Sequence, residues 1–114
     1  MDRLSKSPEL NEVTNWRFEI SQGIDSYPLK QFWAMGIVDA DTGYIASIKL
    51  SKSIGAADIL EYLNHVSAEF GIPFRMIVNV PTEAIALVFE WARSYGVGVS
   101  IAPESRYMTS LVWH

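Results

Sequence analysis

The stretch FGIPFRMIVNVPTEAI, residues 70–85, contains the end of one helix, a complete strand and the start of a second helix. Gly71 suits the position that follows a helix, and Pro73 prevents that helix from continuing. The apolar run after the proline predicts a strand over residues 74–80. Asn79 stands at the end of this run, just before a turn and a new helix. A strand delivers a side chain to a site beside a helix start in this way.

The segments on both sides of this stretch have the period of amphipathic helices. Apolar residues recur at spacings of three and four and predict a first helix over residues 53–70, with Ser53 as its N-cap. The same spacing predicts a second helix over residues 83–95, capped by Thr82. Trp91 falls within the apolar stripe of the second helix, so we interpret it as a core residue.

The remaining apolar runs complete a mixed sheet. Residues 22–28 and 39–43 have the composition of turns, so the three strands that they connect should form an antiparallel meander. The strand after the first helix should run parallel to the first strand, because a helical crossover joins the two. The pattern predicts an α/β domain with a five-stranded mixed sheet and helices on both faces, and a ribonuclease H-like architecture is one of several α/β arrangements that fit it. The predicted strands cover residues 16–21, 31–39, 44–50, 74–80 and 97–102.

Length and composition bound the class of protein. The 114 residues suffice for one domain, and 49% of them are hydrophobic, which suits a globular core. The absence of cysteine from the sequence excludes disulfides and thiolate metal sites. We expect an irregular leader over residues 1–14 and one domain over residues 15–114, with its last helix cut short by the chain end. No apolar run approaches membrane-spanning length and no signal peptide is visible, so we expect an intracellular protein, cytoplasmic or nucleoid-associated.

The charge balance bears on partners. The net charge is −4, and the nine basic residues are scattered along the chain. Strong binding to nucleic acid needs clustered lysines and arginines that neutralise phosphates. Any binding of DNA by this chain alone should therefore be weak.

Over nearly its whole length, from Trp16 to His114, the sequence resembles the catalytic core of retroviral integrases and bacterial insertion-sequence transposases. The likeness is most specific in EFGIPFRMIV, residues 69–78, which matches the end of the family's first helix and its fourth strand. IVDADTGYIAS, residues 37–47, is similar to the end of the family's second strand and the turn after it. Glu83 matches a family glutamate that is not one of the metal-binding acids.

Three positions align with the acidic residues that carry the family's chemistry. Glu19 in WRFEI stands at the first, Asn79 in NVPTEA at the second and Trp113 in SLVWH at the third. The family uses two Mg²⁺ ions, held by carboxylates, to clamp the oxygens of a phosphoryl transfer. Glu19 is one methylene longer than the family's aspartate, Asn79 offers a neutral carbonyl, and Trp113 offers no ligand. We therefore expect these catalytic positions to be non-functional, Glu19 to be a weak metal ligand, and Mg²⁺ or Mn²⁺ to be needed only by an active protein.

The resemblance implies a domain of mobile-element origin, related to DNA integration. We expect it to be catalytically inactive and to serve assembly or weak DNA docking, as a homodimer or within a larger recombinase assembly. One alternative is an active metal-dependent polynucleotidyl transferase that uses Glu19 with Asp39 or Asp41. Another is a protein-interaction module that keeps only the fold.

Ordinary structural roles are also available for these residues. Glu19 lies on the polar face of its strand, where a solvated or arginine-paired acid is commoner than a metal ligand. Asp39 and Asp41 fit a tight turn that is held by side-chain-to-backbone hydrogen bonds. His65 lies away from the apolar stripe of its helix, so a solvated or partner-facing histidine is expected.

Overall fold

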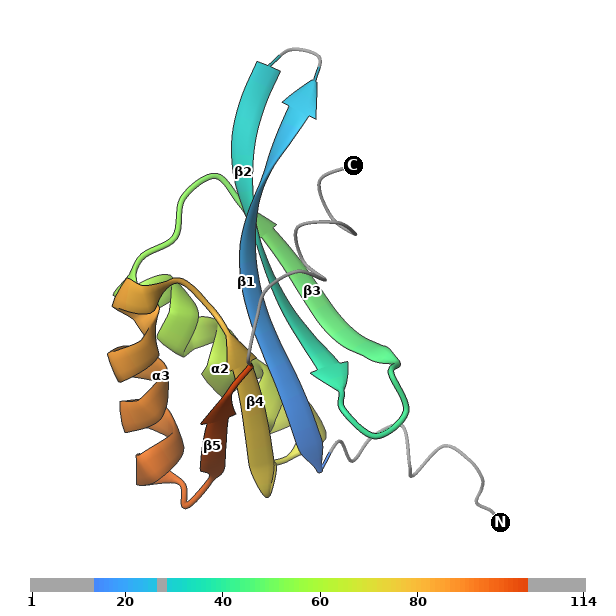
Figure 1. Ribbon diagram of the computed structural model, residues 1–114, viewed down its shortest axis with the longest axis vertical. Coiled ribbons are helices and arrows are strands. Elements are labelled where there is room, and N and C mark those ends of the chain that lie inside the picture. The colour runs from blue at the N-terminus through green and yellow to red at the C-terminus, as the bar shows by residue number, and fades with distance from the viewer. Residues whose placement is uncertain (1–13, 27–28, 103–114) are drawn as a thin grey trace.

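A computed structural model describes residues 14–26 and 29–102 of the chain. Its strands form one five-stranded sheet in the order β3-β2-β1-β4-β5 (Figure 1). β1 pairs antiparallel with β2, and β2 with β3, whereas β4 runs parallel to β1 and to β5. The predicted mixed sheet and its antiparallel meander are thus confirmed. The elements are β1 (Asn15–Ser26), β2 (Leu29–Asp39), β3 (Ile45–Ser51), α2 (Ala56–Phe70), β4 (Arg75–Asn79), α3 (Thr82–Ser94) and β5 (Gly98–Ile101).

The hydrophobic core lies between one face of the sheet and the two described helices. Alternate residues of a strand point to the same face, so β1 presents Trp16 and Phe18 to the helices together. Trp16 stacks on Trp91 of α3 with ring centroids 5.9 Å apart, which confirms the core position predicted for Trp91. Phe18 stacks on Tyr62 of α2 at 6.1 Å. Both helices therefore cover the same face, which we call the helix face.

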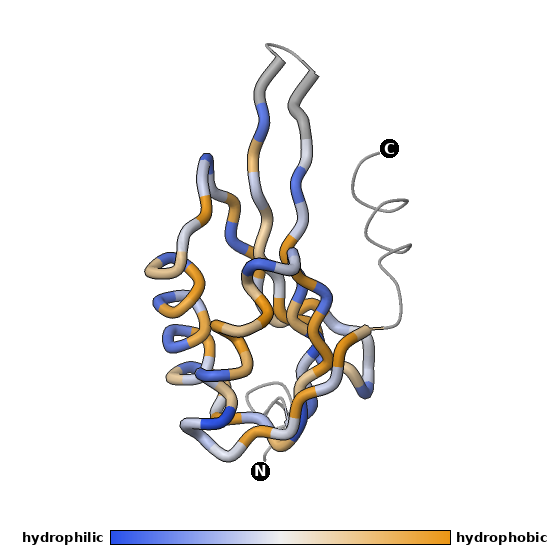
Figure 2. Tube along the Cα trace, turned by 60° about the vertical axis from the view of Figure 1, so that its left-hand side comes forward, coloured by the Kyte–Doolittle hydropathy of each residue, from blue (hydrophilic) through white to orange (hydrophobic). Residues whose placement is uncertain are grey.

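The opposite face, which we call the open face, carries the other residues of each strand. On β1 these are Arg17, Glu19 and Ser21, which alternate with the core residues. Hydrophobic and hydrophilic stretches follow one another along both the helices and the strands in Figure 2. Helices were predicted on both faces, and α2 and α3 both lie on the helix face. The helix predicted near the chain end falls outside the described residues.

The β1–β2 hairpin is longer than the sequence predicts. Residues 22–28 were expected to form a turn, but β1 continues to Ser26 and β2 begins at Leu29. β4 pairs with β1 only as far as Glu19, and β3 with β2 only as far as Trp33. The rest of the hairpin extends beyond the sheet as a two-stranded arm, at the top of Figure 1. The turn prediction failed because polar residues and glycine do not prevent backbone pairing when the opposite strand supplies the hydrogen bonds.

The helix starts also differ from the predictions. α2 begins at Ala56 and its N-cap is Gly55, whose N–H donates to the carboxylate of Asp58 at 2.8 Å. This bond from the third helical position replaces the expected cap at Ser53. The N-cap of α3 is Pro81, so Thr82 is its first helical residue and not its cap. Neither described helix is both long enough and apolar enough to cross a membrane.

Candidate functional site where β1 meets the end of β4

The structure brings two of the three predicted site positions together. Glu19 of β1 and Asn79, the last residue of β4, are direct partners in the parallel ladder. Paired residues of adjacent strands point to the same face and have backbones about 4.8 Å apart. Both side chains therefore belong to the open face, near the centre of the sheet. The third predicted position, Trp113, lies outside the described residues.

The Glu19 carboxylate is largely enclosed, with 16% of its side chain exposed. Its nearest cation is Arg17, two residues earlier on the same face, with Nη1 3.9 Å from Glu19 Oε2. Burial raises the pKa of Glu19, and the Arg17 guanidinium lowers it in part. The expected pairing with an arginine is thus present, but the side chain is half-buried rather than solvated.

Two further residues beside Glu19 were not singled out from the sequence. Gly36 pairs with Glu19 across the β1–β2 ladder, and a Cβ atom at Gly36 would come no closer than 3.7 Å to other atoms. A methyl group at Gly36 would therefore fit in ordinary contact with Ser47 and Ile48. Ser21 is buried next along β1, and its Oγ has no hydrogen-bond partner in the described part of the chain. The alternation of β1 places Ser21 on the face of Glu19, and that parity could have identified it.

The two aspartates of the alternative site, Asp39 and Asp41, lie beside the first residues of β1. Asp39 pairs with Trp16, three residues before Glu19 on β1, which corresponds to about 10 Å along the strand. Its Oδ1 accepts from the backbone N–H of Asp41 at 2.9 Å and of Thr42 at 3.3 Å, as expected of a tight turn. Asp41 differs from the prediction, because its Oδ2 accepts from the side chain of Asn15 at 2.9 Å. The partner, Asn15, is distant in sequence, so a prediction from local hydrogen bonding within the turn could not identify it.

The remaining titratable candidates are separated from Glu19. His65 is on α2, with 74% of its side chain exposed, and contacts Glu69 at 3.8 Å. This agrees with the expectation of a solvated histidine. Within residues 14–26 and 29–102, no three side chains of His, Cys, Asp or Glu gather into a group that could hold a metal ion.

The chemistry of the side chains at the site fits a pair of Mg²⁺ ions poorly. Such ions need several ionised oxygen ligands. Glu19 is the carboxylate at the site, and burial raises its pKa, which opposes the ionised form that a metal ion requires. The Arg17 guanidinium already contributes a positive charge beside it. Asn79 adds only a neutral amide oxygen, so the pair lacks the charge that would offset two divalent cations.

Comparisons with known proteins show likeness in fold. No family model matches the sequence, and no curated protein matches it. The chain is similar to the HTLV-2 integrase catalytic core domain solved with magnesium in a dimeric form, with a TM-score of 0.62 and 14% identity. That match covers 78% of this chain and 60% of the viral one. A chain of the simian T-cell lymphotropic virus intasome, solved in complex with PP2A regulatory subunit B56 gamma, matches with a TM-score of 0.65 and 16% identity. That match covers 87% of this chain and 38% of the viral one.

A more distant structure has the same arrangement. Argonaute of Marinitoga piezophila, in complex with a 5′-OH guide RNA, matches with a TM-score of 0.52 and 20% identity over 79% of this chain and 16% of its own. The chain therefore spans about three fifths of the HTLV-2 core domain and smaller parts of the other two. At these identities, the likeness concerns the path of the backbone. With its 3-2-1-4-5 sheet and antiparallel first strands, the chain has the ribonuclease H-like fold of retroviral integrase catalytic cores.

Proposed function

We propose that this domain is an integrase-core-like module of mobile-element origin that serves assembly or weak DNA docking in a recombinase complex, without cutting DNA. One observation carries the proposal. The ladder partners Glu19 and Asn79 stand where the resemblance aligns two metal-binding acids, and they supply one half-buried carboxylate and one amide beside Arg17. Such a site has too little negative charge to assemble a pair of divalent ions.

The cost of that deficit follows from the chemistry of strand transfer. In a two-metal mechanism the ions stabilise both the attacking and the leaving oxygen, and the carboxylates set their positions. A misplacement of about 1 Å can cost on the order of 100-fold in rate. The longer side chain of Glu19 and the neutral amide of Asn79 both weaken the binding and positioning of the metal ions, and so both lower the rate of strand transfer. Asp39 and Asp41 are held at the far end of β1 by their own hydrogen bonds, so they do not compensate.

The assembly role draws support from the solved neighbours. The HTLV-2 core was solved in a dimeric and in a trimeric form, and the simian viral protein within an intasome. For this chain we propose a homodimer or a place in a larger assembly inside the cell. The net charge of −4 makes DNA docking weak and sensitive to salt.

The decisive test is a Mn²⁺ titration followed through the amide signals of the protein. We expect no localised paramagnetic broadening at Glu19 and Asn79 in the wild type at sub-millimolar Mn²⁺. The matched variant Asn79→Asp restores one charge in the same shape, and localised broadening should appear or strengthen there. Localised broadening in the wild type, together with Mn²⁺-dependent strand transfer that disappears in Glu19→Ala, would contradict the proposal.

DNA retention separates docking from a pure interaction module. Electrostatic binding is strongest at low ionic strength, so the wild type should be retained on a DNA column at about 50 mM salt and released at about 200 mM. Arg17→Gln and Arg75→Gln remove two cations from the open face and should lower the salt needed for release. No retention at the lower salt would favour the module that keeps only the fold.

A further inference from the structure

β3 is an edge of the sheet with both of its faces accessible. It pairs with β2 on one side, and no described strand pairs with its other side. Alternate residues of an edge strand direct their N–H and C=O groups outward, where they can pair with another strand. β3 therefore offers a template for strand addition, and its side chains decide which strand fits.

On the open face, β3 presents large apolar side chains to solvent. Ile48 is 58% exposed and Leu50 is 63% exposed. Their β2 partners are Gly36 and Ala34, which are too small to cover them. A strand added at this edge would place its own alternate side chains next to Ile48 and Leu50. Apolar side chains at those positions would be favoured.

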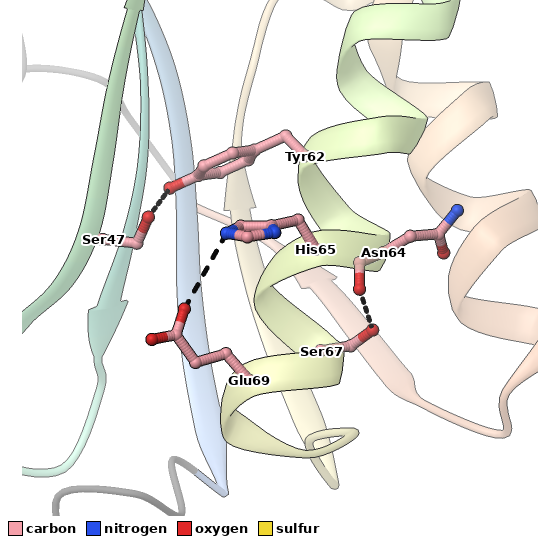
Figure 3. A network of polar contacts seen from close by, with 6 residues as sticks. All are labelled: Ser47, Tyr62, Asn64, His65, Ser67 and Glu69. Carbon is pink, nitrogen blue, oxygen red and sulfur yellow. Dashed lines mark hydrogen bonds and ion pairs between the residues drawn. The ribbon is translucent and has the colours of Figure 1, made fainter.

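On the helix face, β3 and α2 form a polar groove of about 350 Å³, lined in part by Lys49, Glu61 and His65. Tyr62 closes its floor, because its hydroxyl donates to Ser47 Oγ at 2.9 Å. Figure 3 shows Tyr62, His65 and Glu69 extending from α2 toward the strands, with the hydroxyl of Tyr62 at Ser47. The α2 side of the groove carries the carboxylate of Glu61. An incoming strand should therefore bring a cation to this face.

The strand with this pattern is β3 itself, with apolar side chains on the open face and Lys49 on the helix face. We propose that two copies of the chain associate through β3, antiparallel and edge to edge, and so join their sheets. A twofold axis at Ile48 puts each Ile48 opposite its own copy, and Lys49 opposite Ser47 at the partner's groove. This register avoids placing Lys49 opposite Lys49, which like-charge repulsion disfavours.

This inference rests on the assembly role proposed above and names the surface that performs it. The pairing is isologous, because the same residues meet across a twofold axis. Each copy inserts Lys49 beside the partner's Glu61, and the reverse contact forms at the same time. An extended peptide from another protein would need the same alternation, and the experiments below distinguish it from a second copy.

Single cysteines test the register directly, because the natural sequence contains none. Directly opposite residues of an antiparallel pair have Cα atoms about 4.5–5.5 Å apart, within the reach of a disulfide. Ile48→Cys should therefore form a covalent dimer under mild oxidation. Leu50→Cys is the matched control on the same face, and its two copies would lie more than about 13 Å apart. Equal crosslinking of both variants, or none of either, overturns the register.

Charge reversal tests the surface in solution. Ile48→Lys places two lysines opposite each other and should weaken dimerisation, measured by light scattering, by about tenfold or more. Mixing Ile48→Lys with Ile48→Glu should restore a heterodimer. Phe74→Lys is the control, since Phe74 is 75% exposed and lies outside β3.

Each outcome decides between the claims. Dimerisation lost in Ile48→Lys, kept in Phe74→Lys and recovered in the mixture supports the β3 interface. A wild-type dimer that is indifferent to Ile48→Lys overturns this interface and leaves the assembly role standing. A wild type that stays monomeric at high concentration overturns both, and leaves β3 open to a different protein.

Discussion

The two faces of the sheet differ in the residues that they bury and in the residues that they expose. The helix face is continuous and apolar, and the large residues of β1, α2 and α3 interlock there, with Trp16 and Phe18 fully buried. The open face places Glu19, Arg17 and Asn79 at its centre and exposed apolar residues at the β3 edge. The helix face holds the information that specifies the fold. The open face holds Glu19 and Asn79, the two described positions on which the proposed loss of activity rests.

The largest contrast between the faces should appear when an aromatic residue is removed from each. Phe18→Ala leaves a cavity against Tyr62 and should lower the free energy of unfolding by about 3–5 kcal/mol. Phe74→Ala removes a phenyl ring from a position that is 75% exposed, and should change the free energy of unfolding by about 0.5 kcal/mol or less. Urea denaturation measures both values. Similar losses in the two variants would mean that the helix face is not the dominant core.

A smaller effect should come from the polar contact within the helix layer. The indole N–H of Trp91 donates to Asn64 Oδ1 at 2.9 Å, and this bond joins α3 to α2. Asn64→Ala leaves the partly buried indole N–H without that acceptor and should cost about 1 kcal/mol. In a Trp91→Phe background, the same substitution should cost close to nothing. An undiminished cost in that background would show that Asn64 acts through some other contact.

The smallest effect should be seen on the open face and depend on pH. Because burial raises the pKa of Glu19 above its ordinary value of 4.5, the folded state binds that proton more tightly than the unfolded state. Glu19 therefore contributes stability below pH 4.5 that is lost as the pH rises through its folded pKa. Glu19→Gln should remove this loss and make stability less dependent on pH across that window. Thermal unfolding at a series of pH values measures the slope, with Glu83→Gln as the matched control.

The sequence predicted the core and the strand positions of Glu19 and Asn79 well, but it predicted the β1–β2 arm and the β3–α2 groove poorly, for physical reasons. The period of α3 identified Trp91 as a core residue, because burial imposes a strict spacing on a helix. Strand alternation put Glu19 on the polar face, and the strand end at Asn79 was correctly located. The arm formed by β1 and β2 was missed, because local composition does not report pairing between strands. The groove between β3 and α2 was also missed, since its walls come from residues that are distant in sequence.

Helix caps show the same limit on a smaller scale. Ser53 and Thr82 have side chains that commonly cap helices, but the caps lie at Gly55 and Pro81. At α2, the Asp58 carboxylate accepts from the backbone N–H of Gly55, which is a different N–H group from those that a capping serine would bind. A helix start can therefore be stabilised by different side chains that act on different N–H groups. The position of a helix start is therefore hard to predict from sequence to within one or two residues.

The projecting β1–β2 arm affects how the molecule diffuses. The described structure measures 48 × 29 × 25 Å and has a radius of gyration of 14.6 Å. A compact domain of about 100 residues has a radius of gyration near 13 Å. An elongated particle experiences more friction than a sphere of the same mass, so a monomer should elute early from a sizing column and tumble slowly. Its apparent size would then exceed that of a compact domain of the same length, and shortening the arm should delay the elution without changing the number of chains in the particle.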